Sequence, residues 1–355
     1  MMKEHHHEGK RDTKTYATGY SDNYVPLEPL DLSKVDSVDS LVRGMGKCAF
    51  GARNVGEAAD VLEAMAKDKS CFKVLTLSGA MTVAKMGLVI CDMIDSGMVD
   101  AIISTGALMA HGFVESVGMR HFKYTWNMKD EELYEKGYDR IYDTLELEKN
   151  LDDASEIFDK VLEGLDEKEV LCSHKINGIL GEYLVKNTKG RGVLKSAFEK
   201  KVPVYVPAFT DSELGLDFAL HNRKRADEKK QPLQFNPFLD LEDFASRIKA
   251  APKIGIFTIG GGVPRNWAQQ AACYLDLVNN RIGHGGDFKR YSYAVRICPE
   301  PVHWGGMSGC SYSEGVSWGK IVPQSEGGRF VEVFDDATIA WPLIVKSVME
   351  RMKKK

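Results

Sequence analysis

The stretch FKVLTLSGAMTVAKMGLVICDMIDSGMVDAIISTGA, residues 72–107, decides the fold. It begins with an apolar run of strand length at residues 72–77. A turn of small residues then opens a helical segment that ends near Gly97, since glycine is common just after a helix C-terminus. A second apolar run, residues 99–105, leads into another turn. Continuous rather than alternating apolar strands predict a parallel sheet that is covered on both faces.

The same pattern recurs along the chain. Further strands are expected at residues 203–209, 253–259, 291–297 and 329–334, with helices at 267–280 and 338–355, the last carrying Pro342 near its start. Residues 40–68 read as two helical stretches. The charged segment 129–169 is expected to be a solvated helical excursion, because acidic residues crowd it and glycines are few. We therefore predict an α/β fold, a Rossmann-like doubly wound, mostly parallel sheet with helices on both faces.

Composition narrows the functional classes. The 355 residues are 43% hydrophobic with a formal net charge of −4, which suits a sizeable core but neither nucleic acid nor an anionic membrane as partner. The seven cysteines are scattered without a C-x-x-C pair, which is typical of reduced thiols in a cytoplasmic protein. Residues 1–22 are expected to be a flexible tail and 23–355 a single domain. The histidine run at 5–7 has no supporting shell, so no metal site is expected.

Small and polar residues follow several of the expected strands. Ligands of doubly wound sheets lie where strand carboxyl ends meet helix amino ends, and helix N-termini attract anions. The turns at 78–80, 104–107 and 260–262 and the carboxylate of Asp211 occupy such ends. Together they favour a nucleotide-type cofactor, although no strict G-x-G-x-x-G is present. The alternative for each turn is ordinary turn chemistry with a helix cap.

The stretch SEGVSWGKI, residues 313–321, carries the candidate nucleophile Lys320. A lysine amine attacks carbonyls and imines in its neutral form, which burial or a neighbouring cation favours. Trp318 offers an apolar wall and a face for a cationic substrate, and Glu314 offers a partner for an ammonium group. The alternative is a lysine that caps an edge strand while the tryptophan lies in the core. The local sequence leaves both interpretations open.

This stretch closely resembles the active-site segment of the deoxyhypusine synthase family. Five further segments resemble that family in the same order, and the resemblance runs from about residue 23 to the C-terminus: GMGKCAFGARNVGEAADVL, MVDAIISTGA, PVYVPAFTDSELG, IGGGVPRN and VFDDATIAWPLIV. The resemblance implies a Rossmann-like fold, bound NAD and a homotetramer with sites at subunit interfaces. It also implies transfer of the butylamine unit of spermidine through an imine on a lysine, matched here by Lys320, to an acceptor amine.

The resemblance also implies roles for individual residues. Glu314 and Trp318 would contact the polyamine, and Asn266, Asp217 and His111 are further candidates for substrate contact. The implied cofactor residues are Ser78, Gly79, Ala80, Met81, Thr82, Thr105, Gly106, Ala107, Asp211, Gly261, Asp336 and Ala337.

The chain departs from the eukaryotic family pattern where that pattern places charged or imidazole groups. It has Ala110, His111, Leu216, Asn266 and Met307 at those places. Fewer acidic contacts should loosen the grip on a long polycation, so we predict a small diamine acceptor, as in the homospermidine synthases of the family. The alternatives are a protein lysine, as in deoxyhypusine synthesis, and an NAD-linked reaction on another amine such as agmatine. A non-catalytic NAD scaffold is disfavoured because Lys320, Glu314 and Trp318 are all retained.

Overall fold

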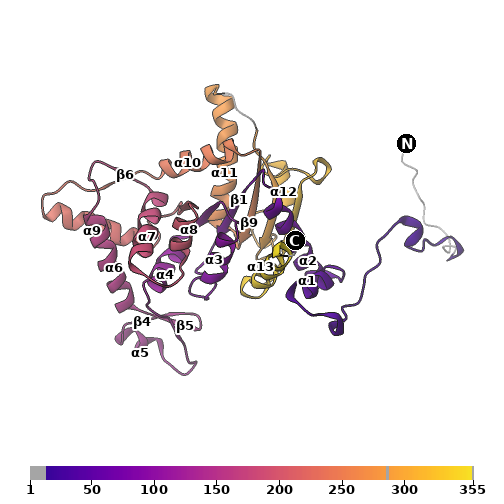
Figure 1. The fold of residues 1–355 in the computed structure, drawn as a ribbon, viewed down its shortest axis with the longest axis horizontal. Helices are drawn as coiled ribbons and strands as arrows, with labels where there is room; N and C mark the ends of the chain where they lie inside the picture. The colour runs from indigo at the N-terminus through magenta and orange to yellow at the C-terminus, as the bar shows by residue number, and fades with distance from the viewer. Residues whose placement is uncertain (1–12, 285–287, 354–355) are drawn as a thin grey trace.

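A six-stranded parallel sheet forms the centre of the molecule (Figure 1). The computed structural model describes residues 13–284 and 288–353. The strand order is β11-β10-β9-β1-β2-β7, and every neighbouring pair is parallel. The predicted fold class is confirmed. The strands are β1 (Cys71–Leu77), β2 (Ala101–Ser104), β7 (Val204–Tyr205), β9 (Lys253–Ile259), β10 (Tyr291–Ile297) and β11 (Arg329–Val333).

Helices cover both faces of this sheet because its strands are apolar on both sides. Successive strand residues point to opposite faces. Leu75 accordingly packs in the larger core, whereas Val74 packs in a second core on the other face. The larger core includes α2 (Phe50–Lys67), α3 (Gly87–Asp95), α4 (Gly106–Ser116), α8 (Val193–Glu199) and α13 (Ala337–Lys353). The second core includes α10 (Phe238–Ala250), α11 (Gly262–Ile282) and α12 (Tyr312–Ser317).

Most of the remaining elements extend the molecule at the β7 end, whereas α1 packs against α2 and α13 near the other end of the sheet. The described helices outside the two sets above are α1 (Val38–Gly46), α5 (Asp130–Glu135), α6 (Glu148–Glu163), α7 (Ser173–Asn187) and α9 (Glu213–Asp227). A small antiparallel sheet has the order β3-β5-β4, from β3 (Phe122–Lys123), β4 (Tyr138–Ile141) and β5 (Thr144–Leu147). β6 (Val170–Leu171) pairs with β8 (Gln234–Phe235). Short 3₁₀ turns lie at Thr13–Thr15, Tyr20–Asp22, Leu32–Lys34 and Gln324–Glu326.

The structure corrects the expectation for residues 129–169. That segment is helical only in part, because β4 and β5 form a hairpin between α5 and α6. The hairpin turns at Tyr142, which has a positive φ of 53°, and β5 buries Leu145 and Glu146. Burial of β5 against the rest of the fold therefore overrides a composition that favours a solvated helix.

Two further elements are shorter than expected. The strand predicted at 203–209 is reduced to Val204–Tyr205, between Pro203 and Pro207. A proline donates no backbone hydrogen bond to a ladder, which limits the strand on both sides. The first helix of the quoted stretch begins only at Gly87, so that residues 78–86 remain a long turn after β1.

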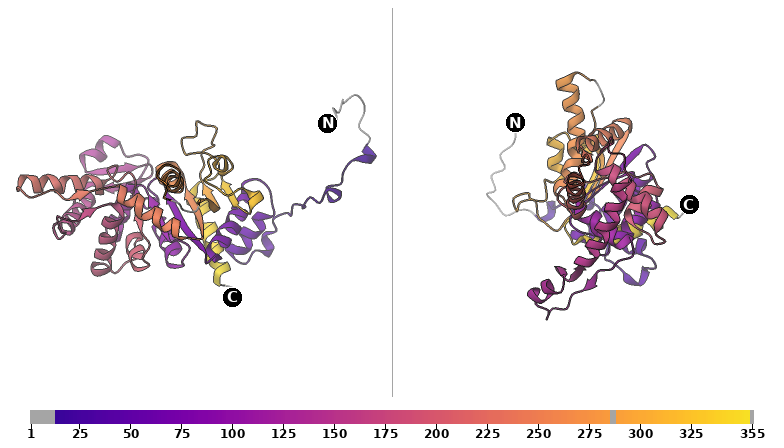
Figure 2. Two further views of the ribbon diagram at one scale, coloured as in Figure 1. Left: turned by 90° about the horizontal axis from the view of Figure 1, so that it is seen from above. Right: turned by 90° about the vertical axis from the view of Figure 1, so that its left-hand side faces the viewer.

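The described part of the N-terminal segment runs away from the body as an extended arm (Figure 1, Figure 2). Residues such as Tyr20, Tyr24 and Val25 are exposed along it. The histidine run at 5–7 lies outside the described residues, and the tail and domain limits stay predictions. Among the described helices, none is sufficiently long and apolar to cross a membrane.

A buried ion-pair cluster joins α1, α2 and α13. Asp39, 2% exposed, accepts a hydrogen bond of 2.6 Å from Arg351 Nε, and Arg351 also contacts Asp60 and Glu63. We expect Asp39→Asn to lower the free energy of unfolding by about 3 kcal/mol at pH 7, because the substitution leaves a buried guanidinium short of a charge. Asp153→Asn on the exposed face of α6 is the control and should cost at most about 0.5 kcal/mol. Urea denaturation of the three proteins measures both effects.

The same carboxylate gives a pH dependence. Burial raises the pKa of Asp39, but the hydrogen bonds from Arg351 and Arg43 outweigh it and lower the pKa to about 2. A folded pKa below the unfolded one means that this stabilisation is present above the usual pKa of Asp, about 3.9, and is lost as the pH falls toward 2. The difference between wild type and Asp39→Asn should therefore shrink below about pH 4. A constant difference from pH 6 to pH 3 would contradict this assignment.

Candidate active site

Three of the glycine-containing turns lie side by side at one edge of the sheet. β9, β1 and β2 are adjacent and parallel, so their carboxyl ends meet there. Ser78 Oγ, after β1, donates a hydrogen bond to the carbonyl of Gly261, after β9. Thr105 Oγ1, after β2, donates to the carbonyl of Gly79 over 2.7 Å. The three turns thus form one continuous surface of backbone groups.

Gly261 is tightly enclosed within this surface. A Cβ atom on it would lie 1.8 Å from the carbonyl oxygen of Ser308, so no other residue fits without moving the 298–311 segment. Arg296, which is 1% exposed, links the two segments that meet here. Its Nε donates a hydrogen bond to the Gly260 carbonyl over 2.9 Å, and its Nη2 donates one to Ser308 Oγ over 2.6 Å. The backbone of this turn is therefore fixed by a buried cation.

Two predicted aspartates lie at further ends of the same edge. A Cβ on Gly106 would lie 3.3 Å from the carbonyl of Asp211, which brings the turn after β7 against the start of α4. Asp336 follows β11 and caps α13, accepting a hydrogen bond of 2.7 Å from the N–H of Thr338. From β7 to β11 the edge spans five strand spacings, about 24 Å. This edge therefore presents four helix N-termini (α4, α9, α11 and α13) along a length that suits an extended dinucleotide.

Lys320 follows α12 and is buried against α11. It is 7% exposed, and its Nζ lies 5.5 Å from the centroid of the Trp318 ring. Cys273 of α11 is near enough to interact electrostatically with it. Nζ makes no ion pair with any residue in the described ranges. Trp318 is 65% exposed, and Glu314, one helical turn before Trp318, is exposed as well. A buried amine thus lies beneath an exposed aromatic face with a carboxylate close by in sequence.

Within one chain, Lys320 lies at the amino-terminal ends of the parallel strands, whereas the glycine turns lie at their carboxyl-terminal ends, the edge described above. Ile321 forms a parallel bridge with Tyr291, the first residue of β10, whereas Gly260 follows the last residue of β9 and donates its N–H to Ile297 at the end of β10. β10 runs from Tyr291 to Ile297, so the two edges are about 20 Å apart. A single carbon atom of a substrate therefore cannot lie in contact with both Lys320 and the Gly261 turn of the same chain.

The other predicted substrate residues are dispersed. Asn266 is exposed on the first turn of α11. Asp217 of α9 accepts a hydrogen bond of 2.8 Å from Ser155, and burial raises the pKa of its carboxyl group. His111 of α4 contacts Glu146 of β5 at 3.1 Å. Asp217 and His111 lie on helices that follow β7 and β2, at the far end of the sheet from β10, so this chain does not bring them to Lys320.

Two arginines were missed by sequence reasoning. Arg296 lies inside an otherwise apolar strand, and a lone charge in such a run is the signal that could have revealed it. Arg265, 2% exposed, places its guanidinium 4.8 Å from the centre of the Tyr312 ring, and its Nε and Nη2 find no acceptor among the described residues. No local pattern distinguishes Arg265 from a helix-surface arginine, because its burial depends on the 298–311 segment.

The family model for deoxyhypusine synthase matches residues 40–348. The chain belongs to the deoxyhypusine synthase family. It is 32% identical over 328 residues to a probable deoxyhypusine synthase 2 of Methanosarcina acetivorans, covering 92% of this chain and 90% of that protein. It is 34% identical over 325 residues to a deoxyhypusine synthase-like protein of Chlorobaculum parvum, covering 90% of this chain and 88% of that one. The family resemblance expected from the sequence is confirmed.

A solved structure agrees with this assignment at the level of the fold. The crystal structure of a putative deoxyhypusine synthase from Entamoeba histolytica superposes with a TM-score of 0.58 and 16% sequence identity, over 91% of this chain and 97% of that one. The residues matched by the family model include the glycine turns, Asp336 and Lys320.

Proposed function

We propose that the protein is an NAD-dependent aminobutyl transferase that moves the butylamine unit of spermidine, through an imine on Lys320, to a small diamine. The observation that carries this proposal is the environment of Lys320: a buried amine without a counter-ion among the described residues, beneath the exposed ring of Trp318. Membership of the deoxyhypusine synthase family supports the reaction type. We place the reaction in the cytoplasm, where NAD and polyamines are available.

The glycine-turn edge fits NAD. Gly261 has no room for a side chain, and the N-termini of α4, α9, α11 and α13 direct N–H groups toward one edge, where pyrophosphate oxygens would be stabilised. Asp211 and Asp336 are the candidate partners for ribose hydroxyls. Bound NAD would accept a hydride from the carbon beside the secondary amine of spermidine and return it at the end of the cycle.

Lys320 would act as the nucleophile between these two hydride transfers. Its Nζ attacks the imine carbon of the oxidised polyamine, the bond to the 1,3-diaminopropane nitrogen breaks, and that diamine leaves with the proton given up by Nζ. The butylamine unit then remains on Nζ as an imine until the acceptor amine displaces the lysine. The Trp318 ring would shield this imine from water and attract the cationic end of the chain, which Glu314 would pair.

The geometry within one chain supports an oligomer whose sites are shared. Lys320 lies about 20 Å from the Gly261 turn of its own chain, so a complete site needs the turn of another copy. Large apolar side chains near Lys320 are exposed, including Trp318 at 65% and Phe288 at 52%. Exposed aromatic groups around an incomplete site are typical of a subunit interface. We propose a homotetramer in which Lys320 faces the cofactor edge of a neighbouring subunit.

The proposed acceptor follows from the positions at which this chain departs from the eukaryotic family pattern. Leu216, Met307 and Asn266 are uncharged, so these positions offer a substrate no ionic partner. All three are exposed, Leu216 at 55% and Met307 at 80%. Each charge-assisted contact that is missing would remove about 1.5–3 kcal/mol of polyamine binding. Such a site should accept a short diamine such as putrescine. The alternative acceptor is a lysine of a translation factor, and the alternative donor is another amine such as agmatine.

Product analysis tests the acceptor. The enzyme is incubated with NAD and spermidine labelled in its butylamine unit, together with either putrescine or the precursor protein. We expect the label in homospermidine and not in protein. Efficient labelling of the protein with putrescine unchanged would contradict the small-diamine acceptor but not the Lys320 chemistry, and label that never leaves spermidine would contradict both.

Gly261→Ala tests the cofactor edge. The new methyl group would lie 1.8 Å from the Ser308 carbonyl and displace a backbone that Arg296 holds. We expect NAD affinity to fall by about 100-fold or more, corresponding to about 3 kcal/mol. Gly190→Ala is the matched control, because its Cβ would meet nothing within 4 Å. NAD titration by calorimetry measures both, and unchanged affinity in Gly261→Ala would place the cofactor elsewhere.

A further inference from the structure

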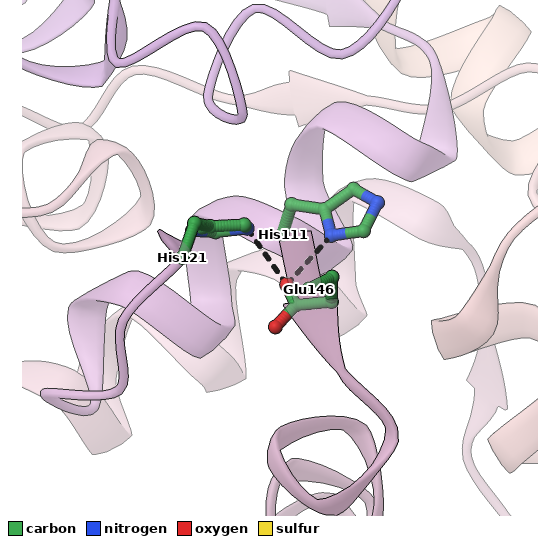
Figure 3. A group of neighbouring side chains, drawn as sticks. All are labelled: His111, His121 and Glu146. Atoms are coloured by element: carbon green, nitrogen blue, oxygen red, sulfur yellow. Dashed lines mark hydrogen bonds and ion pairs between the residues drawn. The ribbon is translucent and has the colours of Figure 1, made fainter. Parts of the chain in front are cut away.

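A second group of chemically reactive side chains lies away from Lys320, where α4 meets the small antiparallel sheet. His111 of α4, His121 just before β3 and Glu146 of β5 bring ligand atoms within 4.8 Å of one another (Figure 3). Glu146 is 1% exposed, and the side chains of His121 and His111 are 0% and 14% exposed. Imidazole and carboxylate are ligands that zinc prefers.

The two histidines converge on a single oxygen. His121 Nε2 lies 2.7 Å and His111 Nδ1 3.1 Å from the same Glu146 Oε2, as the dashed lines in Figure 3 show. The shorter of these contacts lacks the alignment of a hydrogen bond, so that the buried Nε2 has no hydrogen-bond acceptor among the described residues. The contact from His111 is aligned as a hydrogen bond, so the unpartnered, buried Nε2 of His121 beside Glu146 Oε2 is the observation that favours a metal here.

The other oxygen of Glu146 is held in place by neighbours. Oε1 accepts hydrogen bonds of 2.9 Å from the N–H of Leu147 and 3.0 Å from Asn150 Nδ2. These two bonds fix the carboxylate and leave Oε2 for the histidines. Metal-binding carboxylates have such supporting partners in their outer shell.

We propose that His111, His121 and Glu146 bind a divalent ion of the zinc class, one per chain. Two imidazole nitrogens and one carboxylate oxygen leave a fourth position open for water. Both histidines bind in the neutral form: His111 through Nδ1 and His121 through Nε2, with the ring proton of each on its other nitrogen. The site would tie α4 to the β3-β5-β4 sheet. This inference does not depend on the proposed transfer reaction.

One contact competes with the metal. Lys85 Nζ lies 2.8 Å from His121 Nδ1 and 3.2 Å from Glu115 Oε1. An ammonium that donates to Nδ1 keeps the ring proton on Nε2, which blocks coordination. Lys85 is 46% exposed and can turn toward solvent, which leaves Glu115 nearby as a potential acceptor for the Nδ1 proton. The structure therefore predicts that Lys85 weakens metal binding without preventing it.

A second cluster lacks these features. Cys172 Sγ and Asp240 Oδ1 both contact the same nitrogen, His174 Nδ1, at 3.3 and 2.8 Å. Asp240 also accepts the backbone N–H groups of Ser173 and His174 at the start of α7. Its carboxylate is thus used by the helix, and this cluster serves as a control.

Metal titration of the full-length chain tests the proposal. Because the run at 5–7 can itself bind metal, the baseline is the variant with all three tail histidines changed to alanine. After chelator treatment and dialysis against Zn²⁺, we expect one zinc per chain in this baseline. Co²⁺ should give the visible absorption of a nitrogen and oxygen site without a thiolate charge-transfer band.

Three variants on this baseline decide the outcome. Glu146→Gln should weaken Co²⁺ binding about 100-fold. Lys85→Met should tighten it about tenfold, since a nearby positive charge is removed while all three ligands remain. His174→Gln should change nothing. The site would be overturned if the baseline variant, which lacks the tail histidines, bound no zinc. Full Co²⁺ affinity in Glu146→Gln, or a thiolate charge-transfer band, would overturn it as well. Unchanged affinity in Lys85→Met would overturn it too, and this variant does not depend on refolding around an altered Glu146.

Discussion

Replacing Lys320 by arginine is expected to lower aminobutyl transfer by about three orders of magnitude or more, while NAD binding changes by less than about twofold. Arginine keeps the positive charge but has no accessible neutral form, so it cannot attack an imine carbon. The proposed NAD contacts are made by the glycine turns, about 20 Å from Lys320 in the same chain, and arginine keeps the charge that this position presents to a neighbouring subunit, so NAD affinity should change little. Transfer of label from spermidine and NAD titration are the two measurements.

The control is Lys289→Arg. Lys289 lies close to the start of β10 and donates to the Ala251 carbonyl over 2.8 Å, a bond that arginine can reproduce. Borohydride added during turnover should fix a butylamine mass increment on Lys320 in the wild type and on no lysine in the Lys320→Arg variant. Near-normal transfer by that variant, or an increment on another lysine, would exclude the covalent mechanism at this position.

Mixing two inactive variants is expected to restore about a quarter of the wild-type activity. One partner is Lys320→Arg, with an intact cofactor edge. The other is Gly261→Ala, with an intact lysine. If each site combines Lys320 of one copy with the Gly261 turn of another, a mixed pair contains one fully native site out of two. Random mixing makes about half of the pairs mixed, which gives the quarter.

The two possible architectures give opposite results in this experiment. A site formed within one chain would leave every mixed oligomer inactive, because each chain carries one defect. The variants are co-expressed with different tags so that mixed oligomers can be isolated, and their mass is measured by light scattering. An isolated mixed pair should retain about half of the wild-type activity, because one of its two sites is native. Activity in mixed oligomers that matches the unmixed variants, or a monomeric mass, would contradict the shared site.

The central sheet could be predicted from the sequence with close limits for two of its strands, although β7 is much shorter than expected. The apolar runs at 253–259 and 291–297 coincide with β9 and β10, because strands buried on both faces need continuous apolar residues. The turn glycines follow the apolar runs at 72–77, 99–105 and 253–259 within two residues, so their place at the strand ends was also predictable. The motif around Lys320 identified the family because its residue types are dictated by chemistry rather than by packing.

The hairpin of β4 and β5 could not be predicted in the same way. Its strands, YDRI and TLEL, are four residues each and mix apolar with charged side chains, so they lack the continuous apolar run of the central strands. It is fixed by pairing with its neighbours and by the burial of Leu145 and Glu146 against the rest of the fold. Contacts of that kind depend on residues distant in the chain, and local periodicity carries no record of them.

The sequence by itself determined the parallel sheet, the glycine turns and the identity of the candidate nucleophile, because each depends on a local pattern. The tertiary structure alone decided where these parts lie relative to one another. It placed Lys320 and Gly261 at opposite edges of the sheet, and it brought His111 to Glu146, 35 positions away in the chain. The physical reason is that strand order and helix packing fix distances between segments, whereas a motif fixes only the chemistry within its own segment.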